Sequence, residues 1–144
     1  MAGSSITIDL SELVAMNGRL DGLVARAADL TPLMEQIGEA AVTSTVERFE
    51  TTSAPDGTPW AKSQRVIDFG GKTLTLGGFL GGSITHRAGS SEVEIGSGLI
   101  YARVHQLGYD DNNIAARPYL GIGGDDEQTF AELTADYILE DLAA

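Results

Sequence analysis

The chain has 144 residues, a net charge of −12 and an apolar content of 42%. Its length suits one domain with a single hydrophobic core, and its mean hydropathy is close to zero. These values are typical of a soluble globular protein, so disordered and membrane-spanning classes are not expected. Cysteine is absent, which excludes disulfides and thiolate metal sites. Residues 1–8 have neither a basic segment nor a long apolar one, so no secretion signal is expected.

The charge is unevenly spread along the chain. Residues 1–54 hold 8 acids and 3 bases, residues 55–108 hold 4 acids and 5 bases, and residues 109–144 hold 9 acids and 1 base. An acidic surface repels phosphate, so tight non-specific binding of DNA is not expected. The acidic segments form either a solvated face or a wall that DNA passes without binding and that can meet a basic partner.

The N-terminal part is expected to hold a short strand and a helix. Residues 6–8 alternate apolar and polar side chains, which is the pattern of a strand. Asp9 or Ser11 then offers a helix cap, and apolar residues recur at helical spacing from Leu13 to Ala28. Two glycines in that stretch weaken the helix without changing the prediction.

A second helix is predicted to begin with Thr31 as its N-cap and Pro32 as its first residue, because the fixed φ of proline suits that position. This helix should end near Thr51. The following Ser53–Trp60 is rich in turn residues, and residues 53–73 are expected to form a long, mostly irregular arm. Such an arm is either functional or a tolerated insertion.

A β-hairpin is predicted in the second half of the chain. Ser83–Arg87 and Glu92–Gly96 alternate apolar and polar residues, and a small polar turn joins them. A glycine-rich stretch, Leu74–Ser83, precedes the hairpin; it matches no phosphate-binding motif and is interpreted as turns. A short helix is expected over Ile100–Leu107, ended by Gly108.

The C-terminal third is expected to be extended and then helical. Pro118 disfavours a helical conformation at Arg117, so residues 117–122 are predicted to form a strand. Asp125 begins a final amphipathic helix with acids in its first turn. These elements predict a single α+β domain with a small antiparallel sheet. Its expected parts are an N-terminal strand and helices at 1–52, an extended arm at 53–73, and a β-hairpin, short helix, strand and C-terminal helix at 74–144.

The two histidines, His86 and His105, are the residues that catalysis or metal binding would use. The position one helical turn after His105 is Tyr109, so no helical pair of metal ligands exists and a structural or interface histidine is favoured. Ser83, His86 and Asp68 are the right residue types for a catalytic triad, but no nucleophile-elbow motif supports one. No catalytic residue, metal ligand or cofactor is therefore expected. One alternative stays open, a small hydrolase that uses His105 with a carboxylate.

Aromatic, imidazole and guanidinium groups concentrate between residues 101 and 122. Tyr101 and His105 are four residues apart and therefore share a helical face. Trp60, the only tryptophan, either tucks the arm onto the core or anchors a neighbouring subunit. Because Tyr and Arg are enriched at protein interfaces, we interpret the group as a docking surface. The predicted interface residues are Trp60, Phe79, Leu80, Tyr101, His105, Gln106, Arg117, Pro118 and Tyr119.

Three short motifs follow one another along the chain. They are PDGTPW at Pro55–Trp60, YARVHQLG at Tyr101–Gly108 and ARPYLG at Ala116–Gly121. In this order, with Arg48 and Phe49 before them, the chain resembles the tailed-phage virion morphogenesis family, which includes tail-completion proteins. The resemblance runs from about residue 48 into the C-terminal helix.

The resemblance implies a structural protein of the virion neck, involved in tail completion and head–tail joining. Such proteins are homo-oligomers that form rings, usually hexameric, between the head connector and the tail tube. The implied partners are head connector or adaptor proteins and tail terminator or tail tube proteins, with DNA only passing through the lumen and no membrane. The implied location is the neck or tail of the virion, after assembly in the host cytoplasm, and no cofactor is implied. A monomeric capsid adaptor is a further alternative.

Overall fold

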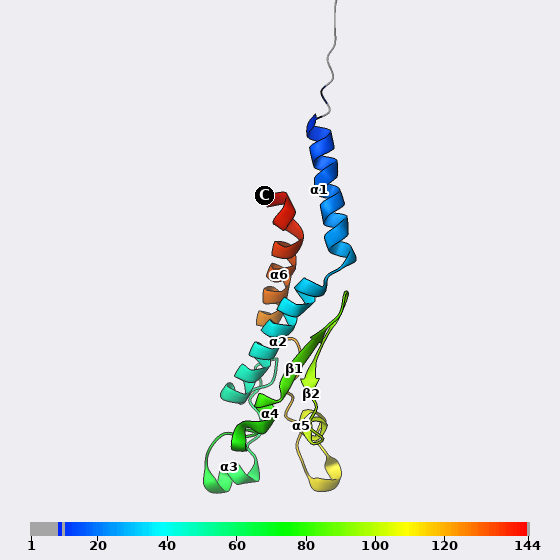
Figure 1. The fold of residues 1–144 in the computed structure, drawn as a ribbon. Helices are drawn as coiled ribbons and strands as arrows, with labels where there is room; N and C mark the ends of the chain where they lie inside the picture. The colour runs from blue at the N-terminus through cyan, green and yellow to red at the C-terminus, as the bar shows by residue number, and fades with distance from the viewer. Residues whose placement is uncertain (1–8, 10, 144) are drawn as a thin grey trace, which may run out of the picture.

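The structure, a computed structural model, describes residue 9 and residues 11–143, with their side chains except at position 13 and positions 141–143. The molecule is elongated, and helix α2 is its central element (Figure 1). One side of α2 packs against α6 and the other against a β-hairpin, while α1 packs against α6 at one end. The strand expected at residues 6–8 lies outside the described residues. The long helices are α1 (Ser11–Ala28), α2 (Thr31–Thr51) and α6 (Gly124–Ala143).

The three long helices confirm the predicted periodicity, with small differences at their starts. Asp9 accepts the backbone amide of Ser11 at 2.9 Å and so supplies a side-chain hydrogen bond where the chain enters α1. Thr31 does not cap α2; it is the first helical residue, and its hydroxyl bonds to a neighbouring carboxylate at 2.6 Å. α6 begins at Gly124, one residue before the predicted start, and three acids in its first turn lie where a helix N-terminus favours negative charge.

The β-hairpin confirms the prediction for the second half of the chain. β1 (Ile84–Ala88) and β2 (Val93–Ser97) pair antiparallel in one continuous register, with Ile84 opposite Ser97. Buried or half-buried side chains alternate with exposed ones along β1, because this strand lies against α2. At the tip, the carbonyl of Ser90 accepts a backbone amide from the junction between α1 and α2 at 2.9 Å. The hairpin is therefore fixed along its length and at its turn.

The hairpin packs on α2 at Gly38. A Cβ atom there would lie 2.4 Å from Cδ2 of His86, so only glycine lets the imidazole come this close to the helix. The same ring bonds through Nε2 to Glu35 of α2 at 2.8 Å. The hydroxyl of Ser83 pairs with that of Ser97 at 2.6 Å. His86 is thus part of the packing between hairpin and helix and forms no triad with Ser83.

The arm at residues 53–73 contains one short helix that was not predicted. It holds α3 (Gln64–Phe69), where Ser63 accepts the Val66 amide at 3.4 Å as an N-cap and Gly70 ends the helix with a φ of 78°. The other short helices gather at the same end of the molecule (Figure 1). They are η1 (Leu76–Gly78), α4 (Phe79–Gly82), α5 (Ala102–Leu107) and η2 (Asp110–Asn112).

Residues 117–122 pair with no strand, so the strand predicted there is wrong as an element of the sheet. The sheet that the described residues form has two strands. Gly108 ends α5 as predicted, with a φ of 78°, and a Cβ atom there would lie 2.8 Å from the backbone nitrogen of Ala116. This close approach brings the segment back alongside α5, where side chains take the place of a strand partner.

The core lies where α2 meets the short helices. The ring of Phe49 is 5.5 Å from that of Trp60 and 5.4 Å from that of Tyr119, between centroids. The observed architecture is a single α+β domain, as predicted. Within the described residues, each helix is too short or too polar to span a bilayer. The buried core cluster consists of Phe49, Trp60, Leu80, Ile84, Ala102 and Tyr119.

A candidate interaction surface and the frame beneath it

Four of the nine predicted interface residues are buried in the chain itself, and two of these four are aromatic. Trp60 packs edge-on against Phe49, and its Nε1 donates to the Pro118 carbonyl at 2.8 Å. Tyr119 is 1% exposed, and its hydroxyl donates to the Ala102 carbonyl at 2.7 Å. Both rings lose contact with water while their polar atoms stay hydrogen-bonded, so they hold the arm and the extended segment on α2. The four buried residues are Trp60, Leu80, Arg117 and Tyr119.

Gln106 satisfies the backbone hydrogen bonds of the extended segment, residues 117–122, in place of a neighbouring strand. Its Oε1 accepts the backbone amides of Tyr119 and Leu120, both at 3.0 Å, and its Nε2 donates to the Leu120 carbonyl at 3.1 Å. Backbone groups that have no ladder partner are satisfied in this way. Burial raises the pKa of the Tyr119 phenol, which therefore stays protonated at neutral pH. Gln106 was predicted at an interface, but both ends of its amide are used inside the chain.

Arg117 is also held from within. Its backbone amide donates to the His105 carbonyl at 2.7 Å, and its Nε donates to the Ala61 carbonyl at 2.7 Å. Through its backbone amide and its guanidinium, Arg117 thereby joins α5, the arm and the extended segment. Pro118, half-buried, contributes the carbonyl that the indole of Trp60 binds. The ARPYLG motif thus links α5, the arm and residues 117–122, which together form the frame of this end of the molecule. Arg117 also lines an apolar groove.

The sequence motifs did not identify the buried ion pair between Arg48 of α2 and Asp126 of α6. Each side chain is 8% exposed, and Nη2 lies 2.5 Å from Oδ2. Arg48 also donates to the Tyr119 carbonyl at 2.7 Å, and Asp126 accepts the Gly123 amide at 2.8 Å. One signal was available: Arg48 stands four residues after Ser44 on the inward face of the predicted helix, where a charge needs a partner. Local sequence pattern could not identify Asp126 as the partner, because it lies on another helix, far away in the sequence.

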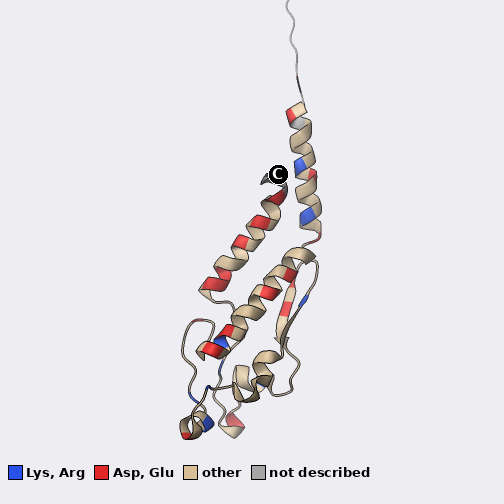
Figure 2. Cartoon of the chain, turned by 60° about the vertical axis from the view of Figure 1, so that its left-hand side comes forward, with Lys and Arg blue, Asp and Glu red and all other residues tan. Residues whose placement is uncertain are grey.

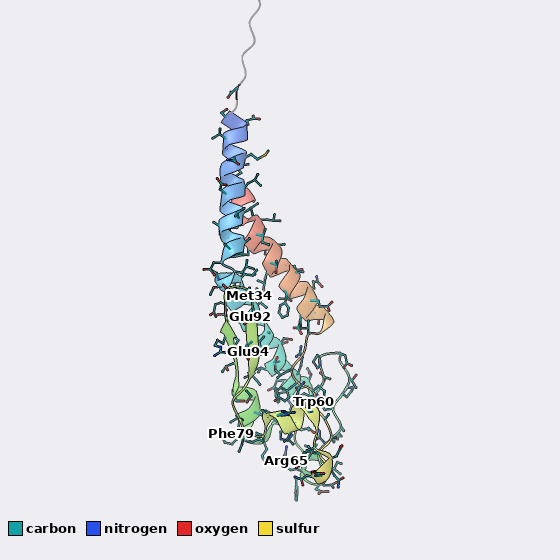
Figure 3. All side chains as sticks on the ribbon, turned by 90° about the vertical axis from the view of Figure 1, so that its right-hand side faces the viewer. Met34, Trp60, Arg65, Phe79, Glu92 and Glu94 are labelled. Atoms are coloured by element: carbon teal, nitrogen blue, oxygen red, sulfur yellow. The ribbon has the colours of Figure 1, made fainter. Side chains whose placement is uncertain are left out.

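An apolar groove lies between α3, η1–α4 and α5. Its cavity volume is about 320 Å³. Phe79 is 71% exposed in its wall, and Leu76 and Tyr101 are exposed beside it. Phe79 and Arg65 lie at the end of the molecule opposite to α1, below the buried Trp60 (Figure 3). The lining includes five of the predicted interface residues: Phe79, Leu80, Tyr101, His105 and Arg117.

Leu74, in the same wall, has a strained backbone. Its φ is 63°, and a left-handed conformation costs a residue with a Cβ atom about 1–2 kcal/mol. Packing of its side chain against the core cluster offsets that cost. Strained non-glycine residues persist only where their surroundings fix them, and they cluster at binding and catalytic sites. This strain is a second feature, besides exposure, that marks the groove.

His105 lies in the groove wall with its ring edge-on to Tyr101, 6.0 Å between centroids, so the two side chains share one helical face as predicted. Burial first, and the Arg117 guanidinium second, lower the pKa of His105 from its ordinary 6.5. In the described part of the chain its Nδ1 is buried with no hydrogen-bond partner, and no Asp or Glu lines the groove. The hydrolase alternative needs His105 bonded to a carboxylate in a concave pocket, and that arrangement is not found here.

Charge is unevenly distributed over the molecule. Acids are spread along α2 and α6 (Figure 2), and residues 124–143 hold 7 acids and no Lys or Arg. The segment that forms the α3 side of the groove carries Lys62, Arg65 and Lys72 against the single acid Asp68. Lys72 pairs with Glu50 of α2 at 2.6 Å, and Asp110 and Asp111 of η2 lie at the same end, so the groove end is less acidic than the rest of the protein without being strongly cationic.

The model of the phage virion morphogenesis family matches residues 11–139. The chain belongs to this family. Neither the curated proteins nor the solved structures gave a match. The matched range begins where α1 begins, so it includes the two N-terminal helices that the short motifs did not cover.

As a member of the phage virion morphogenesis family, this protein has a structural role in building the virion and is associated with it. Its three motifs have now acquired physical roles. Pro55–Trp60 delivers the indole to the core, Tyr101–Gly108 forms α5 with its glycine stop, and Ala116–Gly121 is the segment that Gln106 clamps. In this virion protein the motifs mainly supply buried contacts of the frame, and the exposed groove is formed on the surface of that frame.

Proposed function

We propose that this virion morphogenesis protein acts in the neck of the phage particle, where copies of the chain assemble into a hexameric ring. The ring completes the tail and joins it to the head. Its partners are head connector or adaptor proteins on one side and tail terminator or tail tube proteins on the other. Assembly takes place in the host cytoplasm, and the protein stays in the neck of the finished virion.

The observation that carries this proposal is the exposed apolar groove. Burial of a large apolar side chain such as Phe79 or Leu76 is favourable by about 1.5–3 kcal/mol, yet both are exposed. Apolar surface with a polar residue at its edge, here Arg65, is typical of protein interaction sites. Because hydrogen bonds from Gln106 fix the frame beneath, a partner would meet a preformed surface and lose little conformational entropy on binding.

Phage genetics with a matched pair of variants tests the proposal. Phe79→Asp places a charge in the groove, and we expect electron micrographs of separate heads and tails. Ile122→Asp makes a comparable change at an exposed apolar residue outside the groove lining, and it should give joined virions. Joined, infectious particles from Phe79→Asp, with the subunit present, would contradict the role of the groove. A subunit spread over the capsid would support a monomeric adaptor and contradict the ring.

DNA is proposed only to pass through the lumen of this ring. The acids along α2 and α6 disfavour phosphate contact, and few Lys or Arg are available to release counterions. We expect no retention of duplex DNA by the purified protein in a filter-binding assay at physiological salt. Binding that falls steeply with added salt would show a cationic DNA site and would overturn this part.

A further inference from the structure

A strip of apolar side chains runs along one face of α1. Met16, Leu20 and Val24 are spaced four residues apart and therefore lie above one another on the helix. Their exposed fractions are 57%, 50% and 69%. The contact of α1 with α6 uses another side of the helix, where the guanidinium of Arg26 lies 4.5 Å from the ring centroid of Tyr137. The strip thus remains on the surface of the described molecule.

Helix α1 depends on packing for its stability. Most of the stability of a helix in a protein comes from packing of its apolar face, and Gly18 and Gly22 weaken the intrinsic stability of this one. Contact with α6 covers only part of α1. If a second surface packed against the apolar strip, both apolar sides of α1 would be buried and the helix would be stabilised.

The groove and the strip are complementary in shape and lie at opposite ends of the molecule (Figure 1). The groove is concave and walled by Leu76, Phe79 and Tyr101, whereas α1 is a convex rod. A helix that binds in an apolar groove presents anchors at positions such as i and i+4, and the strip on α1 has that spacing. Because α1 and the groove are far apart in one chain, any contact between them joins two chains.

Charge favours the same pairing. The end that carries α1 also carries α6, with 7 acids and no Lys or Arg over residues 124–143. Lys62 and Arg65 belong to the segment on the α3 side of the groove, whereas Lys72 of that segment already pairs with Glu50 of α2 at 2.6 Å. The acids of α6 and the cations Lys62 and Arg65 are opposite in sign, which favours an encounter between these two surfaces.

We propose that the apolar strip of α1 in one copy lies in the groove of the next copy, with the acids of α6 beside the cations of the α3 segment. The contact is head-to-tail, so each copy uses its two ends on two different neighbours. A contact of this kind closes into a ring when the rotation between copies divides a full turn, and otherwise continues as a filament. The proposal rests on the proposed ring function and names the surfaces that would build it.

Because the chain has no cysteine, single cysteines can be introduced and cross-linked to test this contact directly. Leu20→Cys and Phe79→Cys are made in separate full-length chains, mixed in equal amounts and treated with a short thiol cross-linker. We expect a covalent dimer from the mixture and none from either variant alone, because the contact joins position 20 of one copy to position 79 of another. A mixture of Ile122→Cys with Phe79→Cys controls for random collision. Cross-linking of Leu20→Cys with itself would show pairing of like ends and would overturn the proposal.

Sedimentation separates failure of this contact from failure of the ring. Leu20→Asp and Phe79→Asp should each weaken self-association by at least about tenfold, the effect of losing one apolar anchor. Mixed together, they should form a dimer and nothing larger, since one intact strip and one intact groove remain. If both variants assemble like the wild type, the contact is wrong and the ring stands. If the wild type stays monomeric at every concentration and also with purified heads and tails, both proposals are wrong.

Discussion

Replacement of Asp126 by Asn should destabilise the fold severely. The substitution keeps the shape of the side chain but leaves the guanidinium of Arg48 in a site where both partners are 8% exposed. Loss of one partner of a buried ion pair costs about 3–5 kcal/mol. Arg48 keeps its hydrogen bonds to the Tyr119 carbonyl and the Ser44 hydroxyl, so we expect the lower end, about 3 kcal/mol.

Urea denaturation measures this loss. For small proteins the free energy of unfolding falls by about 1–3 kcal/mol per molar urea, so a loss of 3 kcal/mol lowers the midpoint by about 1–3 M. Trp60 is the only tryptophan and is packed on Phe49, so its fluorescence reports the transition. Glu127→Gln is the matched control, because it removes an exposed acid from the same first turn of α6 and costs no more than about 1 kcal/mol.

A double-mutant cycle gives the decisive result. Arg48→Met alone leaves the carboxylate of Asp126 buried without its cation, and we expect a similar loss. The double variant should lose less stability than the sum of the single losses, with a coupling energy of about 1–3 kcal/mol. Additive losses, or a midpoint for Asp126→Asn equal to that of Glu127→Gln, would refute the claim that this pair joins α2 to α6.

Three further predictions concern glycines, the indole and pH. In thermal melts Gly18→Ala should raise stability by up to about 1 kcal/mol, because nothing lies near the new methyl group. Gly38→Ala should lower stability by about 1–3 kcal/mol, because the methyl group clashes with the imidazole of His86. Stability changes of the same sign in both variants would contradict this. Trp60→Phe should cost about 1–3 kcal/mol by circular dichroism, because a carbonyl loses its donor and a void remains; a loss within error would show that the indole is dispensable. The pKa of His105 is lowered in the fold, so the unfolded chain binds more protons as the pH falls below 6.5 and stability should decrease there. His105→Gln should remove that component of the acid loss in urea titrations, and an unchanged pH dependence would show that other groups cause it.

Local pattern predicted most of the secondary structure. The long helices, the hairpin and the stop at Gly108 each depend on spacing or on one residue's conformational preference, and all are observed. α3 was missed because six residues are too few for a periodic signal, although Ser63 before it and Gly70 after it are caps. The strand at 117–122 was wrong because an extended backbone can be satisfied by a side chain, here Gln106, without a strand partner.

The candidate site was harder to predict than the fold. Whether an aromatic ring faces the core or a partner is set by contacts between distant residues, which explains why Trp60 and Tyr119 were placed at an interface. The groove itself appears only when α3, α4 and α5 come together in space, so its residues could be named but its shape could not. The contact between Tyr101 and His105 was the exception, since His105 belongs to α5 and Tyr101 is the residue directly before it.

The clamp that Gln106 makes has a mechanical consequence. α5 carries His105 of the groove wall, and its Gln106 binds the backbone at Tyr119. The Tyr119 carbonyl binds Arg48, which in turn binds Asp126 at the start of α6. A pull applied at the groove is therefore transmitted to the opposite acidic helix through side-chain bonds that cross the core, without loading a flexible loop. The proposed role in joining head and tail would use this stiffness along the line from the groove to α6.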